Sequence, residues 1–290
     1  MHLPNSKFTK LLLKEFVSDP FEAHEATPAW TFFSEQDWDF QRLEIAGRGQ
    51  GDFDLPITKE QYTLSPGDRV LYYCYFYMQM HYTSSLYVYM KNQAALVPLL
   101  SSNVVFIDFG CGPFTSGAAF WEFCNQAAED ELLSLDYLGI DCSLAMLRRA
   151  REIASGIKGA SHGMSCQFVN CLSKTNAYLN DIQLYLRGKP LTILINLCYV
   201  LASESVDIQQ LYNFVRHLEQ RFPKAQLLII HQNPSFDLLN EKWYQLRKLI
   251  NGFHSIQEEE LTFSYQDEVG NRHHRFVRDR SVYTQILAKK

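Results

Sequence analysis

Four polar residues stand at or near the ends of four short apolar runs, and their types and spacing suit ligand binding. They are Asp108, Asp141, Asn170 and Asn196, at the ends of predicted strands 104–107, 137–141, 166–170 and 191–197. Because ligands bind beside the carboxyl ends of the strands in an open parallel sheet, we expect the four side chains to line one site. Carboxylate and amide oxygens accept hydrogen bonds from hydroxyl and amino groups. The pattern therefore predicts a site for a polar ligand that carries such groups.

A glycine turn follows Asp108 directly, with Gly110 and Gly112 in the order Asp-Phe-Gly-Cys-Gly. A strand, a glycine turn and a helix start, here capped by Thr115 or Ser116, together form a cradle for a nucleotide. Dinucleotide-binding turns have a third glycine three residues after the second, where this chain has Thr115. A carboxylate before the turn would repel a pyrophosphate but suits a cationic ligand. The alternative is a plain strand–turn–helix with convenient glycines.

The rest of the chain alternates apolar runs with amphipathic segments. A fifth strand is expected at 226–231, and helices are expected at 143–157, 174–187, 208–221 and 236–250. This alternation predicts a parallel, doubly wound sheet with helices on both faces. Two longer strand patterns, 255–265 and 275–287, flank Gly270-Asn271 and predict an antiparallel hairpin. We therefore expect an α/β fold with a mostly parallel seven-stranded sheet that ends in this hairpin.

The acidic strand end followed by Gly-x-Gly resembles motif I of the class I (Rossmann-like) S-adenosylmethionine-dependent methyltransferases. The resemblance covers about residues 100–232, and the closing hairpin is also similar to that family. Phe114 stands where the family often has a third glycine. The resemblance implies S-adenosylmethionine as cofactor, with its methionine end held by Asp108, Gly110, Cys111 and Gly112.

The same resemblance implies a role for each of the remaining strand ends. Asp141 would accept hydrogen bonds from the two ribose hydroxyls, and Cys142 beside it would lie near the adenine. Asn170 would accept a hydrogen bond from the adenine amino group, and Asn196 would line the methyl-donor sulfur. The alternative for Asp141 is a cap on the helix that follows it, and both roles can hold at once.

Two residues are candidates for catalysis, Tyr199 and His231. Tyr199 follows the fourth strand and could stack on a planar substrate, and His231 could serve as a general base near neutral pH. The alternative for His231 is a hydrogen-bonded strand histidine. The segment 233–236, Asn-Pro-Ser-Phe, resembles the Asn-Pro-Pro-Tyr motif of amino-group methylases but follows the fifth strand rather than the fourth. Alignment of the reactants alone can supply much of the rate of methyl transfer, so a dedicated base is not required.

The first 100 residues are expected to form an aromatic-rich helical extension or lid, separate from a Rossmann domain at 101–290. A helix is expected at 7–18, ended by Asp19-Pro20, and another begins at Ser65. The run 70–90 is apolar nearly all round, which predicts a buried helix or helix pair. By the resemblance, Tyr82, Thr83 or Ser84 could touch the ligand. The glycine-rich loop around Arg48 could contact phosphate, but a solvated loop is the favoured interpretation.

Composition excludes several classes of protein. The net charge of −5 over 290 residues argues against a protein that coats nucleic acid nonspecifically. Seven cysteines without a Cys-x-x-Cys pair favour small buried thiols in a reducing compartment over a zinc site, so no metal is expected. No signal core or membrane span is recognisable, and we expect a cytoplasmic protein. One basic cluster, Arg272 to Arg280, could contact nucleic acid, although Glu258 to Glu260 could neutralise it across the hairpin.

The sequence thus predicts methyl transfer from S-adenosylmethionine to an unidentified acceptor, either a small planar molecule or a nucleic-acid base. The alternative is a catalytically inactive partner or regulatory subunit with the same fold, which would still bind the cofactor.

Overall fold

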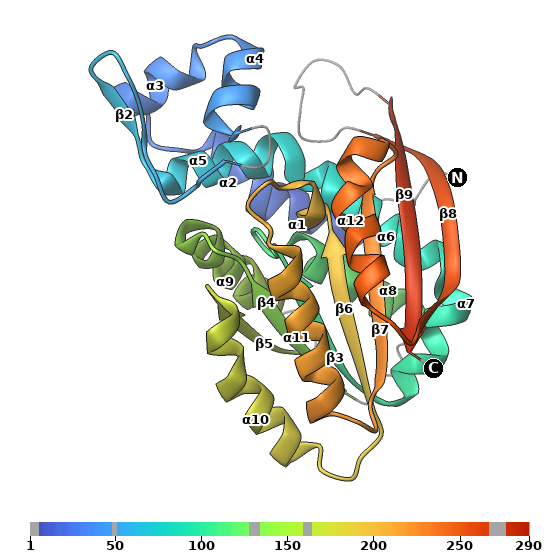
Figure 1. The fold of residues 1–290 in the computed structure, drawn as a ribbon. Coiled ribbons are helices and arrows are strands. Elements are labelled where there is room, and N and C mark those ends of the chain that lie inside the picture. Colours follow the sequence, from blue (N-terminus) through green and yellow to red (C-terminus); the bar gives the residue numbers. More distant parts are fainter. Residues whose placement is uncertain (1–5, 48–50, 128–133, 159–163, 267–276, 290) are drawn as a thin grey trace.

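A seven-stranded sheet forms the centre of the molecule (Figure 1). The computed structural model describes residues 6–47, 51–127, 134–158, 164–266 and 277–289. The strands are β3 Asn103–Phe109, β4 Ser134–Ile140, β5 Met164–Val169, β6 Leu191–Cys198, β7 Gln226–Pro234, β8 Phe253–Gln266 and β9 Val277–Lys289. Their order across the sheet is β5-β4-β3-β6-β7-β9-β8. The first five are parallel, and β9 pairs antiparallel with both β7 and β8.

This arrangement confirms the predicted fold class, because the strand order and the closing antiparallel pair are those of the class I methyltransferase fold. The order reverses direction at β3, with β4 and β5 on one side and β6 and β7 on the other. In register, Asp108 on β3 lies opposite Gly139 on β4 and Asn196 on β6. The fold therefore places the glycine turn at the point where open α/β sheets bind ligands.

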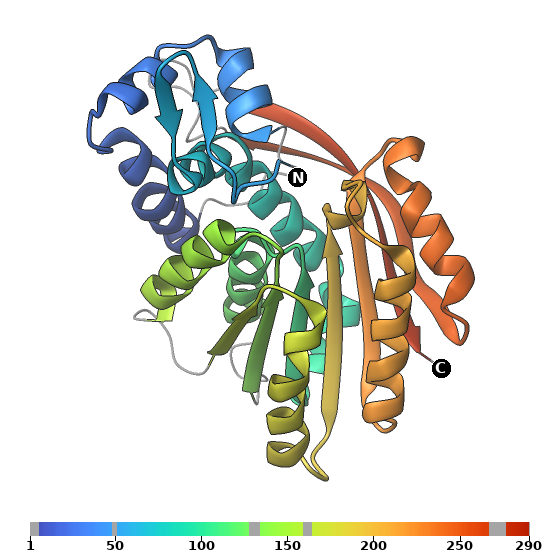
Figure 2. The same ribbon diagram turned by 60° about the vertical axis from the view of Figure 1, so that its left-hand side comes forward.

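Helices cover both faces of the sheet (Figure 2). One face packs against α6 Gln79–Lys91, α8 Thr115–Ala127 and α9 Leu144–Lys158, and the other against α10 Thr175–Tyr185, α11 Ile208–Arg221 and α12 Asp237–Leu249. The strands β3, β6 and β7 are buried on both faces, which explains their nearly continuous apolar sequences. Alternate residues of β3 enter the two cores: Phe106 enters the first and Ile107 the second.

The extension begins across the carboxyl ends of the parallel strands and then runs along one face of the sheet toward their amino ends (Figures 1 and 2). It contains α1 Lys7–Leu13, α2 Asp19–Glu22, α3 Pro28–Ser34, α4 Trp38–Phe40, β1 Ile57–Lys59, β2 Tyr62–Leu64, α5 Pro66–Tyr73 and α7 Gln93–Leu96. As predicted, Ser65 caps α5, here in a reciprocal capping box with Asp68. The run 70–90 is the predicted buried helical stretch, formed by α5, a π-helical segment at Cys74–Met78, and α6.

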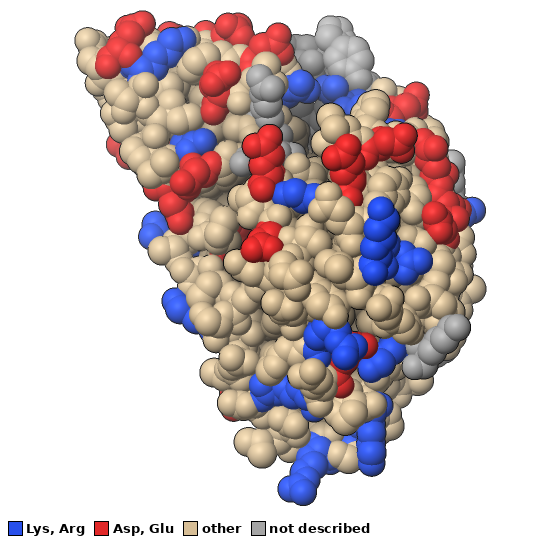
Figure 3. All heavy atoms as spheres, viewed as in Figure 1, with Lys and Arg blue, Asp and Glu red and all other residues tan. Residues whose placement is uncertain are grey.

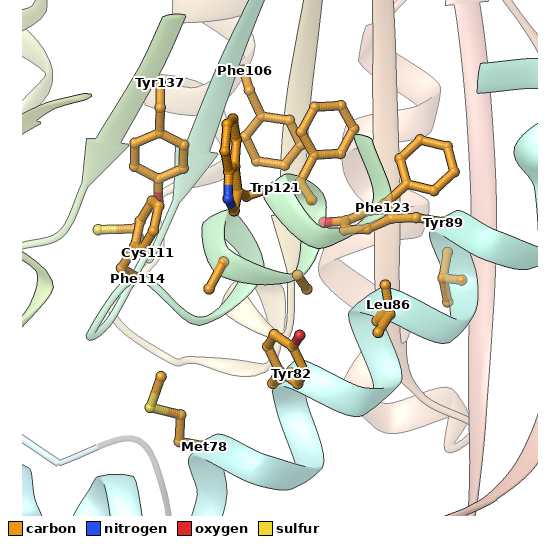
Figure 4. Close-up of a cluster of buried hydrophobic side chains, with 14 of the residues drawn as sticks. Met78, Tyr82, Leu86, Tyr89, Phe106, Cys111, Phe114, Trp121, Phe123 and Tyr137 are labelled. Carbon is orange, nitrogen blue, oxygen red and sulfur yellow. The ribbon is translucent and has the colours of Figure 1, made fainter. Parts of the chain in front are cut away.

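Residues of α6 are part of the main hydrophobic core rather than of a separate one. Figure 4 shows Tyr82, Leu86 and Tyr89 from this helix facing Phe106 and Phe123 from β3 and α8. The Tyr89 ring packs edge-on against Phe106 and lies 6.1 Å from Phe123, measured between centroids. A second, smaller core inside the extension gathers Trp30, Phe33, Ile45, Ala46, Leu64 and Tyr72.

Two local predictions were wrong. Pro20 does not end the helix, because the helical backbone continues from α1 through a π-helical segment at Lys14–Ser18 into α2, which contains Pro20. The fifth strand does not stop at His231 but continues to Pro234, because β9 pairs with it over that whole length. The extension is helical as predicted, and it also contains a small antiparallel hairpin formed by β1 and β2.

The register of the C-terminal hairpin also corrects one expectation. Residues 258–260 lie opposite residues 283–285, whereas Arg278 and Arg280 lie opposite Tyr265 and Phe263. Glu258 instead accepts hydrogen bonds from Tyr283 and Gln285. The predicted neutralisation of these two arginines by Glu258 to Glu260 is therefore wrong. The rest of the basic cluster, 272–275, and Arg48 lie outside the described residues.

Four cysteines, Cys74, Cys111, Cys124 and Cys198, are buried thiols within the cores, whereas Cys142 is exposed. Among the described helices, none combines the length and the apolar character that crossing a membrane requires.

Candidate functional site

The glycine turn is tied to the tip of the neighbouring strand β4. Gly110 and Gly112 have φ angles of +62° and +50°, which side chains disfavour. The amides of Gly110 and Cys111 both donate to the Ile140 carbonyl, at 2.8 and 3.2 Å, and the Gly112 amide donates to Asp141 Oδ2 at 2.9 Å. The turn after β3 and the carboxylate after β4 therefore form one unit. The Cys111 side chain is buried beside Gly139, and its thiol donates to the Gly112 carbonyl at 3.6 Å within the turn.

Phe114 has a left-handed backbone at the position where the related motif often has glycine. Its φ is +74°, and its ring lies directly over Gly117, where an added Cβ would be 2.3 Å from the Phe114 Cε2 atom. The same ring packs edge-on against Tyr137 at 4.7 Å between centroids. Gly117 thus provides the space that the Phe114 ring occupies.

Asp141 lies at the tip of β4 and is partly exposed. Its Oδ2 accepts from the Gly112 amide and its Oδ1 from the Ser143 amide, both at 2.9 Å. Burial raises the pKa of this carboxyl group, while the two amides oppose the rise. A carboxylate has about four acceptor positions, so about two remain for another donor. The structure therefore allows Asp141 to cap the next helix and to bind hydroxyl groups at the same time.

Sequence reasoning missed Asp54, which comes from the extension and contacts the start of α9. It accepts hydrogen bonds from Ser143 Oγ at 2.9 Å and from the amides of Leu144 and Ala145, both at 2.8 Å. Nothing in the local sequence around Asp54 indicates this contact, because its partners are about 90 positions away.

Asn170 and Cys142 lie on the same edge of the sheet as Asp141. The Asp141 amide donates to the carbonyl of Val169, the last residue of β5, which places Asn170 directly beside this turn. Asn170 Oδ1 accepts a hydrogen bond from Lys174 at 2.7 Å. An amide oxygen has a second lone pair, so this contact leaves one acceptor position on Asn170.

Asp108 and Asn196 are brought together, but they lie beneath the surface. Both are 1% exposed, and Asn196 Nδ2 donates to Asp108 Oδ1 at 2.8 Å. Tyr137 donates to the second Asp108 oxygen at 2.8 Å, and Tyr89 donates to Asn196 Oδ1 at 3.1 Å. Burial raises the pKa of Asp108 to about 7, although its two hydrogen-bond donors favour the ionised form. Asp108 therefore changes charge near neutral pH.

Side chains of the extension and of the loop after β6 cover this buried network. Val200 fills the space over Gly110, where an added Cβ would be 2.6 Å from its Cγ2 atom, and the Tyr73 hydroxyl lies near Gly112. Two pronounced surface hollows lie elsewhere, one of about 330 Å³ between α10 and α11 and one of about 350 Å³ beside β5. Asp141 is thus partly exposed, whereas the neighbouring turn toward Asp108 is covered by Val200 and Tyr73.

An aromatic pair lies between the glycine turn and the tip of β6. The His81 and Tyr199 rings are stacked, with centroids 4.2 Å apart and planes 24° apart. His81 Nδ1 is 3.2 Å from the Tyr73 hydroxyl, and burial lowers the pKa of His81 to about 4. The Tyr199 hydroxyl is 3.0 Å from Ser84 Oγ, which Gln232 also contacts. Tyr199 has a φ of +59°, a strained conformation that is often found at functional sites.

Three residues of α6 were expected near the ligand. Of these, Ser84 lies beside Tyr199, whereas Tyr82 contacts the buried carboxylate of Glu122 on α8. Thr83 is buried, and no contact of its side chain defines a role.

His231 lies on the opposite face of the sheet from His81 and Tyr199. It is 0% exposed, its ring stacks on Trp243 at 4.3 Å, and its Nε2 is 3.0 Å from Asn240 Oδ1. Burial lowers its pKa to about 4, so its ring is neutral at physiological pH. These contacts favour the structural interpretation of His231, and it is not part of the site that we propose.

Three solved structures that are similar to this chain are methyltransferases. Precorrin-6y C5,15-methyltransferase from Geobacter metallireducens matches with a TM-score of 0.41 and 11% identity, over 69% of this chain and 88% of that one. Magnesium protoporphyrin IX methyltransferase from Synechocystis PCC 6803, solved with bound SAH, matches with a TM-score of 0.39 and 13% identity, over 74% and 88%. The plantazolicin methyltransferase BpumL, also solved with SAH, matches with a TM-score of 0.32 and 13% identity, over 98% of each chain.

No protein-family model and no curated protein sequence matches this chain. The fold assignment therefore depends on the strand order and strand directions described above, and not on these matches.

Proposed function

We propose that this protein transfers a methyl group from S-adenosylmethionine to an acceptor molecule. The observation that carries the proposal is Asp141, a partly exposed carboxylate with unused acceptor positions. It lies at the tip of the second parallel strand and is joined to a glycine turn at the reversal point of the sheet. This is where a carboxylate can bind the two hydroxyl groups of a ribose.

The residues present fit the adenosyl part of this cofactor. Asp141 would accept from the ribose hydroxyls, and the remaining acceptor position on Asn170 Oδ1 would meet the adenine amino group. Cys142, which is exposed beside Asp141, would border the adenine. At the methionine end, a bound ammonium group would favour the ionised form of Asp108. Gly110 and Gly112 keep the backbone of the turn free of side chains.

The covered side of the site requires local movement before it can accept the methionine end. Tyr73 and Val200 are the side chains that lie over Gly112 and Gly110, so these two must shift. The bound cofactor would supply an electrophilic methyl group on a sulfonium. The protein's part is then to align an acceptor with that group and to exclude water.

We propose a small planar molecule as acceptor. The stacked His81–Tyr199 pair offers flat ring surfaces next to the tip of β6, which suit a planar molecule. On the face shown in Figure 3, acidic side chains gather over the extension and the strand tips, whereas the opposite end carries mainly basic ones. Phosphates of a nucleic acid would be repelled at the acidic end. This charge distribution makes a nucleic-acid base the less favoured acceptor.

Calorimetry with S-adenosylhomocysteine tests the cofactor assignment. Asp141→Ala is expected to weaken binding by about 1.5–3 kcal/mol, the cost of losing charge-assisted hydrogen bonds. Asp181→Ala is the control, because Asp181 is an exposed carboxylate on α10. Unchanged affinity in a folded Asp141→Ala protein would contradict the ribose assignment, and absence of binding to the unmodified protein would contradict the proposed function.

A transfer assay then separates an enzyme from an inactive binding protein. The purified protein is incubated with S-adenosylmethionine labelled in its methyl group and a cell extract divided into RNA, DNA, protein and small-molecule fractions. We expect label in the small-molecule fraction. Binding of S-adenosylhomocysteine without transfer to any fraction would support the alternative of an inactive partner.

A further inference from the structure

The four backbone amides at the start of α9, residues 143–146, are all satisfied by side chains. The Ser143 amide donates to Asp141, the next two amides donate to Asp54, and the fourth donates to Ser143 Oγ at 3.1 Å. Helix starts are usually capped by residues next to them in sequence. Here two of the four amides donate to Asp54 of the extension. The extension therefore caps the start of α9, the helix that follows Asp141.

The loop that carries Asp54 is itself fixed by buried contacts. Arg69, which is 5% exposed, donates to the carbonyls of Ile45 at 3.2 Å and Leu55 at 2.6 Å, and also to the carbonyl of Asp52. Phe53 is buried, and its ring packs edge-on against the Tyr73 ring at 5.3 Å. The contacts of Arg69 and Phe53 thus fix the loop that places Asp54 against α9.

Ser143 joins the two carboxylates. Its amide donates to Asp141 Oδ1 and its hydroxyl donates to Asp54 Oδ1, both at 2.9 Å. Burial opposes ionisation of Asp54, but the hydrogen bonds from Ala145, Leu144 and Ser143 lower its pKa overall, so it is a carboxylate at neutral pH. A shift of the Asp54 carboxylate would move Ser143 and would change the direction in which Asp141 presents its remaining acceptor positions.

We infer that Asp54 is a positioning residue of the cofactor site: it orients Asp141 through Ser143 and so makes the extension part of that site. This inference rests on the proposed function, because it assumes that Asp141 binds the ribose. It assigns Asp54 no contact with the cofactor. It also predicts that cofactor binding and docking of the extension strengthen each other, as linked equilibria must.

A double-mutant cycle on S-adenosylhomocysteine affinity tests this inference. Asp54→Asn keeps one acceptor atom but loses the charge and the second acceptor, and we expect affinity to fall about fivefold, the size of a typical cap contribution. If Asp54 acts through Asp141, Asp54→Asn should have almost no further effect in an Asp141→Ala background. Asp52→Asn is the matched control, because asparagine can still accept the hydrogen bond from the Asp54 amide and the Asp52 carbonyl that accepts from Arg69 is unchanged.

Each outcome of the cycle decides the inference. A non-additive cycle supports it, and so does faster amide exchange at residues 144 and 145 in the ligand-free Asp54→Asn protein. Unchanged affinity of Asp54→Asn, or full additivity with Asp141→Ala, would overturn it while leaving the proposed function intact. Absence of binding to the unmodified protein would overturn both. If Asp54→Asn does not fold, Ser143→Ala takes its place in the cycle, because it removes the hydroxyl that links the two carboxylates.

Discussion

Replacement of Asp108 by asparagine should change how the stability of this protein depends on pH. Asp108 is 1% exposed, and burial raises its pKa to about 7 from an ordinary value of 3.8. In the unfolded chain the same carboxyl group ionises near its ordinary value. Between about pH 4 and pH 7 the folded protein therefore keeps a proton that the unfolded chain releases, and stability falls as the pH rises.

The size of the effect follows from the pKa difference. Each pKa unit corresponds to about 1.4 kcal/mol, so the rise from 3.8 to about 7 makes folding less favourable by at most about 4 kcal/mol above pH 7. Asparagine has nearly the same shape and carries no charge at any pH. The free energy of unfolding of Asp108→Asn should therefore gain up to about 4 kcal/mol on that of the unmodified protein between pH 4 and pH 8.

Urea unfolding of both proteins without ligand, followed by tryptophan fluorescence at pH 4, 5, 6, 7 and 8, measures this difference. The cost of mismatched hydrogen bonds to Tyr137 and Asn196 is the same at each pH and cancels from the trend. The buried histidines His81 and His231 are present in both proteins and cancel as well. A difference that stays constant from pH 4 to pH 8 would refute the reasoning, because it would mean that Asp108 ionises normally inside the protein.

Three further substitutions have expected outcomes. His231→Gln should leave S-adenosylhomocysteine affinity unchanged in calorimetry and should reduce the loss of stability below about pH 6.5, because His231 is held neutral in the fold with a pKa lowered to about 4. Gly156→Leu should destabilise the protein by about 1–3 kcal/mol in urea unfolding, since an added Cβ would be 2.2 Å from the Phe16 ring, and Phe16→Ala in the same protein should recover part of the loss. Glu122→Ala should cost about 1–3 kcal/mol by removing the carboxylate that accepts from Tyr82, Thr9 and Gln126, whereas Glu122→Gln should cost less on the same measurement.

The central strands β3, β6 and β7 were predictable because each contains a short apolar run that is buried on both faces of the sheet. The fourth strand was expected at 191–197 and is Leu191–Cys198, and the hairpin strands were also located. The end of the fifth strand was not predictable, because Gln232, Asn233 and Pro234 read as a polar loop. These three residues pair with residues 282–284 of β9 and so extend the strand to Pro234. A local sequence pattern does not indicate a pairing partner that is distant in the sequence.

The candidate site shows the same limit. Asp141 and the glycine turn could be located because adjacent residues define them. Asp54 and His81 could not, because each acquires its environment from segments distant in sequence, α9 for Asp54 and the Tyr199 loop for His81. The sequence indicated an accessible His231 only because the fifth strand is expected to end at that residue.

The Phe114 ring and the bare backbone of Gly117 behave as a single interlocking unit, so neither position can be engineered alone. Changing Phe114 to glycine would relax the backbone but leave a void beneath α8, and enlarging Gly117 would collide with the ring. Even a reciprocal exchange, with glycine at 114 and a larger residue at 117, would place a Cβ 2.6 Å from the Tyr137 ring. A sequence pattern that requires glycine at position 114 would overlook this chain, in which the glycine stands about one helical turn later, at Gly117.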